Sequence, residues 1–348
     1  MMKKWYESTE NVHDVVVSSR VRLARNLENY PFPAKCDHDT AARAAKEIID
    51  ALQKNYGEPL DVLSMNELHG DKRVFVEDHI VSQEFIAPSD KERVLLADFG
   101  GNLAVMIHEE DHVRIQALYP GFALEKAYET ASRADDALSK GVSVAFDETL
   151  GFLTACPTNL GTGLRASVML HLPAMCAFGY IKTLSALMTK IGLTVRGTFG
   201  EGSEATACLY QISNQVTLGL SEQDAIEKLR GATMQIVEKE RELRKKMMNE
   251  SGNDVTDKLW RSFGTLSYAR KLSTTEASHL ISNVRLAAAC GVIPECRSLN
   301  TTSLLFDILP AHITSRFPEA VTPEKRDEYR AKLIRERLAD ASGADEGN

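Results

Sequence analysis

The chain lacks the features that mark secreted, membrane and zinc-ribbon proteins. Its longest apolar stretch, near Val168–Tyr180, is interrupted by His171 and Pro173, and the N-terminus MMKKWYESTENVHD has no apolar core of a signal peptide. The six cysteines form no C-x-x-C pair and show no zinc-ribbon spacing. We therefore expect a cytoplasmic protein in a reducing compartment, without disulfides or a membrane-spanning segment.

Basic charge and the common phosphate-binding motifs are also scarce. The 348 residues carry 41 Lys+Arg against 49 Asp+Glu, a formal net charge of -8, which argues against nonspecific nucleic-acid binding or an anionic membrane as the main partner. No G-x-x-x-x-G-K-[ST] phosphate loop is present. The tripeptide Asp98-Phe99-Gly100 spells the DFG of protein kinases, but without a V-A-I-K strand or an H-R-D loop it carries no weight.

The first two-thirds of the sequence mixes short strands with helices. DVVVSSRVRLARN alternates apolar and basic residues as a strand does, and residues 92–118 read as a hairpin that turns at Gly100-Gly101-Asn102. GFLTACPTN and GLTVRGTFG predict further strands that run into loops. Because strict β-α-β alternation is missing, the pattern predicts an α+β fold in which an antiparallel sheet is flanked by helices.

The last third is predicted to be helical. Ser221 with Asp224, Ser273 with Glu276, and Thr322-Pro323 are helix-start signals, and the second helix should end near Cys290-Gly291. A charged segment that ends in Gly252-Asn253-Asp254 suggests a domain boundary. We therefore predict a catalytic domain over residues 1–245, an all-helical domain over 255–340 and a flexible tail over 341–348.

The stretch HEEDH, residues 108–112, satisfies the zinc-protease pattern H-E-x-x-H. That pattern binds zinc only on a helix, where residues i and i+4 share a face. The flank VRIQAL alternates instead, and on an extended strand the two histidines would lie ~13 Å apart, so we expect no metal site. In the strand interpretation Glu110, His112 and Arg114 share one face, either in a functional site or on a solvated outer surface.

Five arginines stand where predicted strands meet loops. Arginine suits phosphate oxygens because its charge is permanent and its donors form a fork. Single arginines are usually surface residues, but the glycine-rich surroundings of two of them would let the backbone approach a ligand closely. The five are Arg20, Arg22, Arg114, Arg165 and Arg196.

Four segments together resemble the catalytic domain of phosphagen (guanidino) kinases: SSRVRLARN, HEEDHVRIQ, CPTNLGTGLRASV and RGTFGEGSEA, in order and roughly in spacing. The resemblance covers about Val12 to Glu240 and implies ATP as the phosphoryl donor, with Mg²⁺ held mainly by the nucleotide and no protein metal site. It places the nucleotide against Ser18, Ser19, Arg20, Val21, Arg22, His79, Arg114, Arg165, Ala166, Ser167, Val168, Met169, Arg196, Gly197, Thr198, Phe199 and Gly200.

The same resemblance implies two catalytic carboxylates, Glu110 and Glu201, and a reactive thiol, Cys156. A protonated guanidinium is a poor nucleophile, so two carboxylates would align it with the γ-phosphorus while one of them accepts its proton. Cys156 would add a third contact, although a small buried cysteine is the alternative. Glu109 and Asp111 are expected to face away as solvated or metal-shell neighbours, and His112 has no assigned role.

The helical C-terminal region is not found in kinases of free arginine or creatine, but it resembles that of the bacterial protein-arginine kinases. The segment RDEYRA would then bind phosphoarginine through Arg326, Asp327, Arg330 and Ala331 and raise activity, where a salt-bridged surface helix is the alternative. Kinases of free arginine or creatine carry an N-terminal helical domain before the first motif, and this sequence lacks that domain. The resemblance therefore also implies a cleft open to folded protein substrates.

Implied partners are protein substrates, among them a CtsR-like repressor, an McsA-like activator and a ClpC-type unfoldase, with the chain itself a homodimer or higher oligomer. Three alternatives remain: a kinase of a free guanidino metabolite, an inactive phosphoarginine-binding adaptor, and a zinc hydrolase. Retention of both glutamates and all five arginines argues against the adaptor.

Overall fold

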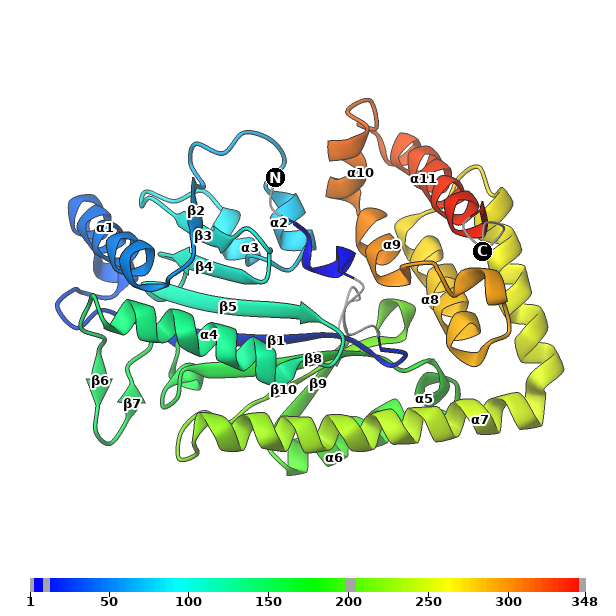
Figure 1. Ribbon diagram of the computed structural model, residues 1–348, viewed down its shortest axis with the longest axis horizontal. Helices are drawn as coiled ribbons and strands as arrows, with labels where there is room; N and C mark the ends of the chain where they lie inside the picture. Colours follow the sequence, from blue (N-terminus) through cyan, green and yellow to red (C-terminus); the bar gives the residue numbers. More distant parts are fainter. Residues whose placement is uncertain (1–2, 9–12, 198–204, 344–348) are drawn as a thin grey trace.

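The computed structural model describes residues 3–8, 13–197 and 205–343. Its centre is an eight-stranded sheet in which every neighbouring pair is antiparallel (Figure 1). The predicted α+β class is therefore confirmed. Across the sheet the strands are β2 (Leu60–Ser64), β3 (Val94–Asp98), β4 (Leu103–Ile107), β5 (Val113–Pro120), β1 (Val16–Arg25), β8 (Leu164–His171), β10 (Leu209–Asn214) and β9 (Leu193–Gly197). A separate ribbon pairs β6 (Phe146–Asp147) with β7 (Gly151–Phe152).

One face of the sheet packs on helices and forms the main hydrophobic core. The alternating residues of the central strands, such as Val21, Ile115 and Val168, are fully buried there. Alternation places their neighbours on the opposite face, where the arginines lie. The covering helices are α1 (His38–Asn55), α4 (Leu124–Ser139), α6 (Ile181–Lys190) and the first half of α7 (Glu222–Tyr268). The short helices α2 (Arg73–Glu77) and α3 (Gln83–Ile86) follow β2, and α5 (Pro173–Ala177) follows β8.

The C-terminal third is helical, as predicted, but it is not separated from the first part by a linker. Helix α7 runs through the expected boundary and is non-helical only at Ser251, with φ −137° and ψ 31°, immediately before Gly252. Charge pairs one turn apart, Glu240 with Arg244 at 2.8 Å and Lys246 with Glu250 at 3.8 Å, support the helix through this charged segment. The glycine therefore marks a kink rather than a loop.

Beyond the kink, four α-helices follow the end of α7, and all but the third of them form a second core with it (Figure 1). They are α8 (Thr274–Cys290), α9 (Thr301–Asp307), α10 (Pro310–Arg316) and α11 (Pro323–Gly343). The predicted caps at Ser221, Ser273 and Gly291 are confirmed, and Gly291 adopts φ 70°, which ends α8. No described helix, including the 47-residue α7, combines the length and apolar character needed to cross a lipid bilayer.

Candidate active site

Three central strands form a cationic face on the side of the sheet away from the main core. Arg22 of β1 lies opposite Arg165 of β8 and Gln116 of β5, and Arg114 of β5 lies opposite Ala24, the next residue on that side of β1. Residues directly opposite one another in an antiparallel pair have their side chains on the same face. The register therefore brings together arginines that are far apart in the sequence.

Most of this positive charge is not neutralised by the described residues, among which only Arg114 of the four central arginines forms an ion pair. Arg20 donates to Gln211 at 2.8 Å and to Ser167 at 3.4 Å, which are neutral groups. The Nε atoms of Arg22 and Arg165 are buried without a hydrogen-bond partner among the described residues. Buried donors of this kind indicate a polyanionic ligand.

Burial and mutual repulsion depress the basicity of these arginines. Burial, together with the charges of Arg114 and Arg165, lowers the pKa of Arg20 to about 10. Burial and the neighbouring arginines also lower the pKa of Arg22 well below its ordinary value. An arriving phosphate would offset the cost of burial and the mutual repulsion of the arginines, because it supplies the counter-charge that the resting site lacks.

His79 lies at the edge of the cationic face, in the loop after α2. Burial, and then the charges of Arg20 and Arg22, lower the pKa of His79 to about 3, so its imidazole is neutral at physiological pH. Its backbone is in the left-handed region, with φ 59°, and its carbonyl accepts a hydrogen bond from Gln116 Nε2 at 2.7 Å. Gln116 thus links the histidine loop to β5, which also carries Arg114.

The predicted extended conformation of HEEDH is wrong. Residues 108–112 form the turn between β4 and β5, closed by a hydrogen bond of 3.0 Å from His108 N to His112 O. His108 adopts φ 62°, and the ring centroids of the two histidines are 5.9 Å apart rather than ~13 Å. Among the described residues no group of three or more His, Cys, Asp or Glu side chains is arranged to hold a metal ion.

The turn exposes Glu110 beside the cationic face. Partial burial, and then the neighbouring carboxylates Asp111 and Glu109, raise the pKa of Glu110. A raised pKa suits a carboxylate that must accept a proton during catalysis.

The two flanking acids are not solvated, contrary to the prediction. Glu109 accepts hydrogen bonds from Ser82 Oγ at 2.6 Å and from Arg114 Nη1 at 2.5 Å. It therefore holds Arg114 in place on the cationic face.

Asp111 connects the Glu110 turn to the segment that carries Cys156. It is 3% exposed, and its Oδ1 accepts from Asn26 Nδ2 at 2.6 Å and from Ala155 N at 2.7 Å. Asn26 also accepts from His112 N at 2.9 Å, so one buried amide joins both loops. No sequence pattern indicates Asn26, and the run of three acids in HEEDH is the only signal for the structural roles of Glu109 and Asp111.

Cys156 is partly exposed rather than a buried packing residue. It precedes a short 3-10 helix (Pro157–Asn159), and its Sγ lies 3.0 Å from Thr158 Oγ1. The Asp111–Ala155 bond places this thiol next to the turn of Glu110. The thiol and the carboxylate thus come from loops joined by the same buried network.

Not every predicted nucleotide-site residue has its side chain on the cationic face. Ser18, Ser167 and Met169 share that face, and Arg196 is an exposed residue of β9 opposite Gln211. The side chains of Ser19, Val21, Ala166 and Val168 point to the main core instead. Gly197 ends β9, whereas Thr198, Phe199, Gly200 and Glu201 lie outside the described residues.

The RDEYRA segment lies in the first half of α11 and is partly built into the C-terminal core. Arg330 is 1% exposed and donates to Ile308 O at 2.8 Å, to Leu272 O at 2.7 Å and to Asp327 Oδ1 at 2.5 Å. Ala331 is fully buried. Only Arg326 and Asp327 of the four predicted residues remain partly exposed, so the expected pair of accessible arginines is reduced to one.

A face of uncompensated arginines beside a carboxylate of raised pKa is typical of an enzyme that transfers a phosphoryl group. Residues 42–243 match the family of ATP:guanido phosphotransferase C-terminal catalytic domains, and residues 252–348 match the C-terminal domain of protein-arginine kinase McsB. The two matches meet near the kink of α7.

Relatives cover nearly the whole chain. The protein-arginine kinase of Halothermothrix orenii is 42% identical over 338 residues, which are 97% of this chain and 97% of that protein. The protein-arginine kinase of Brevibacillus brevis is also 42% identical over 338 residues, covering 96% of this chain and 94% of the relative. The chain therefore belongs to the protein-arginine kinase family, and it is a phosphotransferase with a phosphagen kinase catalytic domain.

A solved structure with the same fold is the duplicated taurocyamine kinase from Schistosoma mansoni with bound transition state analog components. It is 28% identical, with a TM-score of 0.61, and the match covers 74% of this chain and 39% of that chain. The chain thus spans well under half of that duplicated protein.

Proposed function

We propose that the chain transfers the γ-phosphoryl group of ATP to the guanidinium group of arginine side chains in proteins. The observation that carries the proposal is the cationic face, in which Arg22 and Arg165 keep buried Nε donors without partners among the described residues, beside Glu110. The family match and the names of the relatives supply the acceptor, an arginine of a protein.

The residues divide the work between donor and acceptor. The arginines would bind the phosphates and stabilise the charge that develops during transfer. Neutral His79 would contact the nucleotide without adding a further positive charge beside the arginines. Glu110 would align the acceptor guanidinium and take its proton, and Cys156 would contact the same group. Mg²⁺, which the family implies, would enter with the nucleotide and help to neutralise the charge of its phosphates.

The direct test is an incubation of the purified chain with Mg²⁺-ATP and an arginine-rich protein, compared with free arginine as acceptor. We expect acid-labile phosphorylation of the protein, as a P–N bond requires, none with Glu201→Ala, and a rate lower by about 10²–10⁴-fold with Glu110→Gln. Ready phosphorylation of free arginine with untouched protein arginines would instead identify a kinase of small guanidino metabolites.

The proposal includes a second site, at the RDEYRA segment. Asp327 would bind the guanidinium of phosphoarginine and Arg326 its phosphoryl group, while buried Arg330 would hold Asp327 in place. Phosphoarginine bound there would raise activity, and equal activity of autophosphorylated Asp327→Ala and wild type would contradict this.

The cellular role in the proposal is the marking of damaged proteins for a Clp-type protease under stress in the cytoplasm. Its partners would be an McsA-like activator, a ClpC-type unfoldase and substrates such as a CtsR-like repressor, with the chain as a homodimer or larger assembly. Stimulation of activity by the activator in a purified mixture, and the mass of the chain by light scattering, would test these parts.

A further inference from the structure

Three consecutive residues at the edge of the cationic face, Glu77, Asp78 and His79, are all contacted by the C-terminal helices. The carboxylate of Glu77 accepts hydrogen bonds from the backbone of Ala311 at 3.0 Å and of His312 at 3.2 Å. These N–H groups begin α10, where the helix leaves donors unsatisfied. A residue of the catalytic part therefore caps a helix of the C-terminal part.

Asp78 is buried in a polar cluster between the two parts. Its Oδ1 accepts from Tyr6 Oη at 2.6 Å and lies 2.8 Å from His312 Nε2. Its carbonyl accepts from Trp5 Nε1 at 2.7 Å. Because buried charged groups lose much free energy when a partner is removed, this cluster fixes the backbone that leads into His79.

Phe306 of α9 reaches the nucleotide-site histidine itself. Its ring is 1% exposed and meets the His79 ring edge-on, with centroids 5.3 Å apart and an interplanar angle of 85°. The same ring stacks on Tyr6 at 4.7 Å and meets Trp5 at 5.2 Å. Phe306 thus packs against one side of the His79 imidazole, while Arg20 and Arg22 lie near the imidazole within the cationic face.

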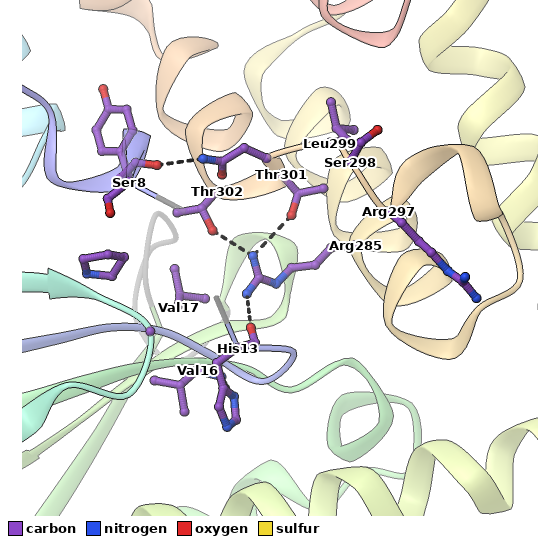
Figure 2. Close-up of a pocket in the computed structure, with 14 residues that line it drawn as sticks. Ser8, His13, Val16, Val17, Arg285, Arg297, Ser298, Leu299, Thr301 and Thr302 are labelled. Carbon is purple, nitrogen blue, oxygen red and sulfur yellow. Dashed lines mark hydrogen bonds between the residues drawn. The ribbon is translucent and has the colours of Figure 1, made fainter. Parts of the chain in front are cut away.

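The N-terminal segment that carries Trp5 and Tyr6 is itself hydrogen-bonded to the C-terminal part. Figure 2 shows Arg285 of α8 between Thr302 and the backbone of His13, to which it donates at 2.8 and 3.0 Å. Asn300 donates to Tyr6 O at 2.9 Å. The cavity drawn there, ≈ 320 Å³, is lined by residues of the N-terminal segment, β1 and the end of β5, and by Arg285 and residues 297–302 of the C-terminal part.

His79 needs such support because its backbone conformation is unfavourable. A φ of 59° is rare for a residue with a side chain and persists only where the surroundings enforce it. Gln116 holds the carbonyl of His79 from the sheet side, and Phe306 packs on its ring from the opposite part of the molecule. Because Phe306 is the residue that packs edge-on against the imidazole, loss of its ring should shift the imidazole on the cationic face.

We infer that Phe306 is a positioning residue: through His79, the C-terminal helices set the nucleotide affinity of the catalytic face. This inference rests on the proposed function, in which His79 contacts ATP. It predicts that loss of the Phe306 ring weakens ATP binding specifically and leaves the acceptor site unchanged.

The experiment compares Phe306→Leu with Leu304→Ala in the full chain. Leu304 is a matched control, because it lies on the same helix and is 2% exposed, but it packs in the C-terminal core and not against Trp5 and Tyr6 as Phe306 does. We expect Phe306→Leu to raise the KM for ATP about tenfold, while kcat and the KM for the protein acceptor change less than about threefold. Leu304→Ala should lower thermal stability without this rise.

A double-mutant cycle with His79→Gln separates positioning from general packing. If Phe306 acts through His79, Phe306→Leu should raise the KM for ATP in wild type but change it less than twofold in the His79→Gln background. Equal effects of Phe306→Leu in both backgrounds, or an equal rise with Leu304→Ala, would overturn the inference. Absence of ATP-dependent arginine phosphorylation in the wild type would instead refute the proposed function, and ATP binding by calorimetry distinguishes the two failures.

Discussion

Replacement of Arg22 by methionine should stabilise the ligand-free protein and impair its activity. Arg22 lies opposite Arg165, near Arg20 and Arg114, with its Nε unpaired among the described residues. Two unit charges about 6–8 Å apart repel by roughly 2–3 kcal/mol at an effective dielectric constant of about 20. Because water reaches part of the site, we expect a net gain of only about 1 kcal/mol from an uncharged side chain of similar length.

The gain in stability should raise the midpoint of thermal unfolding by roughly 1–2 °C. The loss in function should be larger, because a charge-assisted hydrogen bond to a phosphate contributes about 1.5–3 kcal/mol, or a factor of about 10–150 in kcat/KM for ATP. Differential scanning fluorimetry with and without Mg²⁺-ATP measures the stability and the nucleotide binding, since the variant should start higher and gain less from the nucleotide, and steady-state kinetics measures kcat/KM.

Arg25→Met is the matched control on the same strand. Arg25 is 1% exposed and is paired with Asp135 at 2.7 Å and with Glu222 at 3.3 Å. Its removal leaves two partly buried carboxylates, Asp135 and Glu222, without their guanidinium partner and should destabilise the protein by about 3–5 kcal/mol. A lower unfolding midpoint for Arg22→Met than for wild type would refute the argument that Arg22 is an uncompensated charge.

Three further predictions concern the carboxylate, the histidine and the metal. Glu110→Gln should lower kcat by about 10²–10⁴-fold with little change in ATP binding. Since the pKa of Glu110 is raised, wild-type kcat/KM should fall as the pH decreases through a value above 4.5, and this fall should be missing from the pH profile of the variant. The pKa of His79 is lowered from 6.5 to about 3, so between these values the unfolded chain binds a proton that the folded chain does not, and stability decreases as the pH falls below 6.5. Urea unfolding at pH 7.5 and 5.0 should therefore show a smaller decrease in stability for His79→Gln than for wild type. An equal decrease in both proteins would contradict this. Chelation of Mg²⁺ should abolish phosphoryl transfer without shifting the unfolding midpoint of the nucleotide-free chain, because the described residues form no metal site; a lower midpoint would reveal a structural metal.

Local sequence patterns were enough to predict the class of the fold and the shared face of Arg20 and Arg22. Alternation along β1 predicted that Arg20 and Arg22 share a face, because the side-chain period of a strand is two. The hairpin turn after Asp98 and the helix caps at Ser221 and Ser273 depend on local hydrogen bonds, which neighbouring residues specify. These features could be predicted because the interactions that form them are short-range.

The contacts between distant segments could not be predicted in this way. HEEDH failed as a strand because its two histidines are joined across a turn, and the roles of Glu109 and Asp111 depend on Ser82, Asn26 and Ala155, which lie 27 to 85 residues away. Likewise, no pattern in α9 indicates that the ring of Phe306 meets His79 from 227 residues further along the chain. Side-chain contacts between remote segments depend on the relative placement of whole elements, which hydrophobic periodicity and capping signals do not encode.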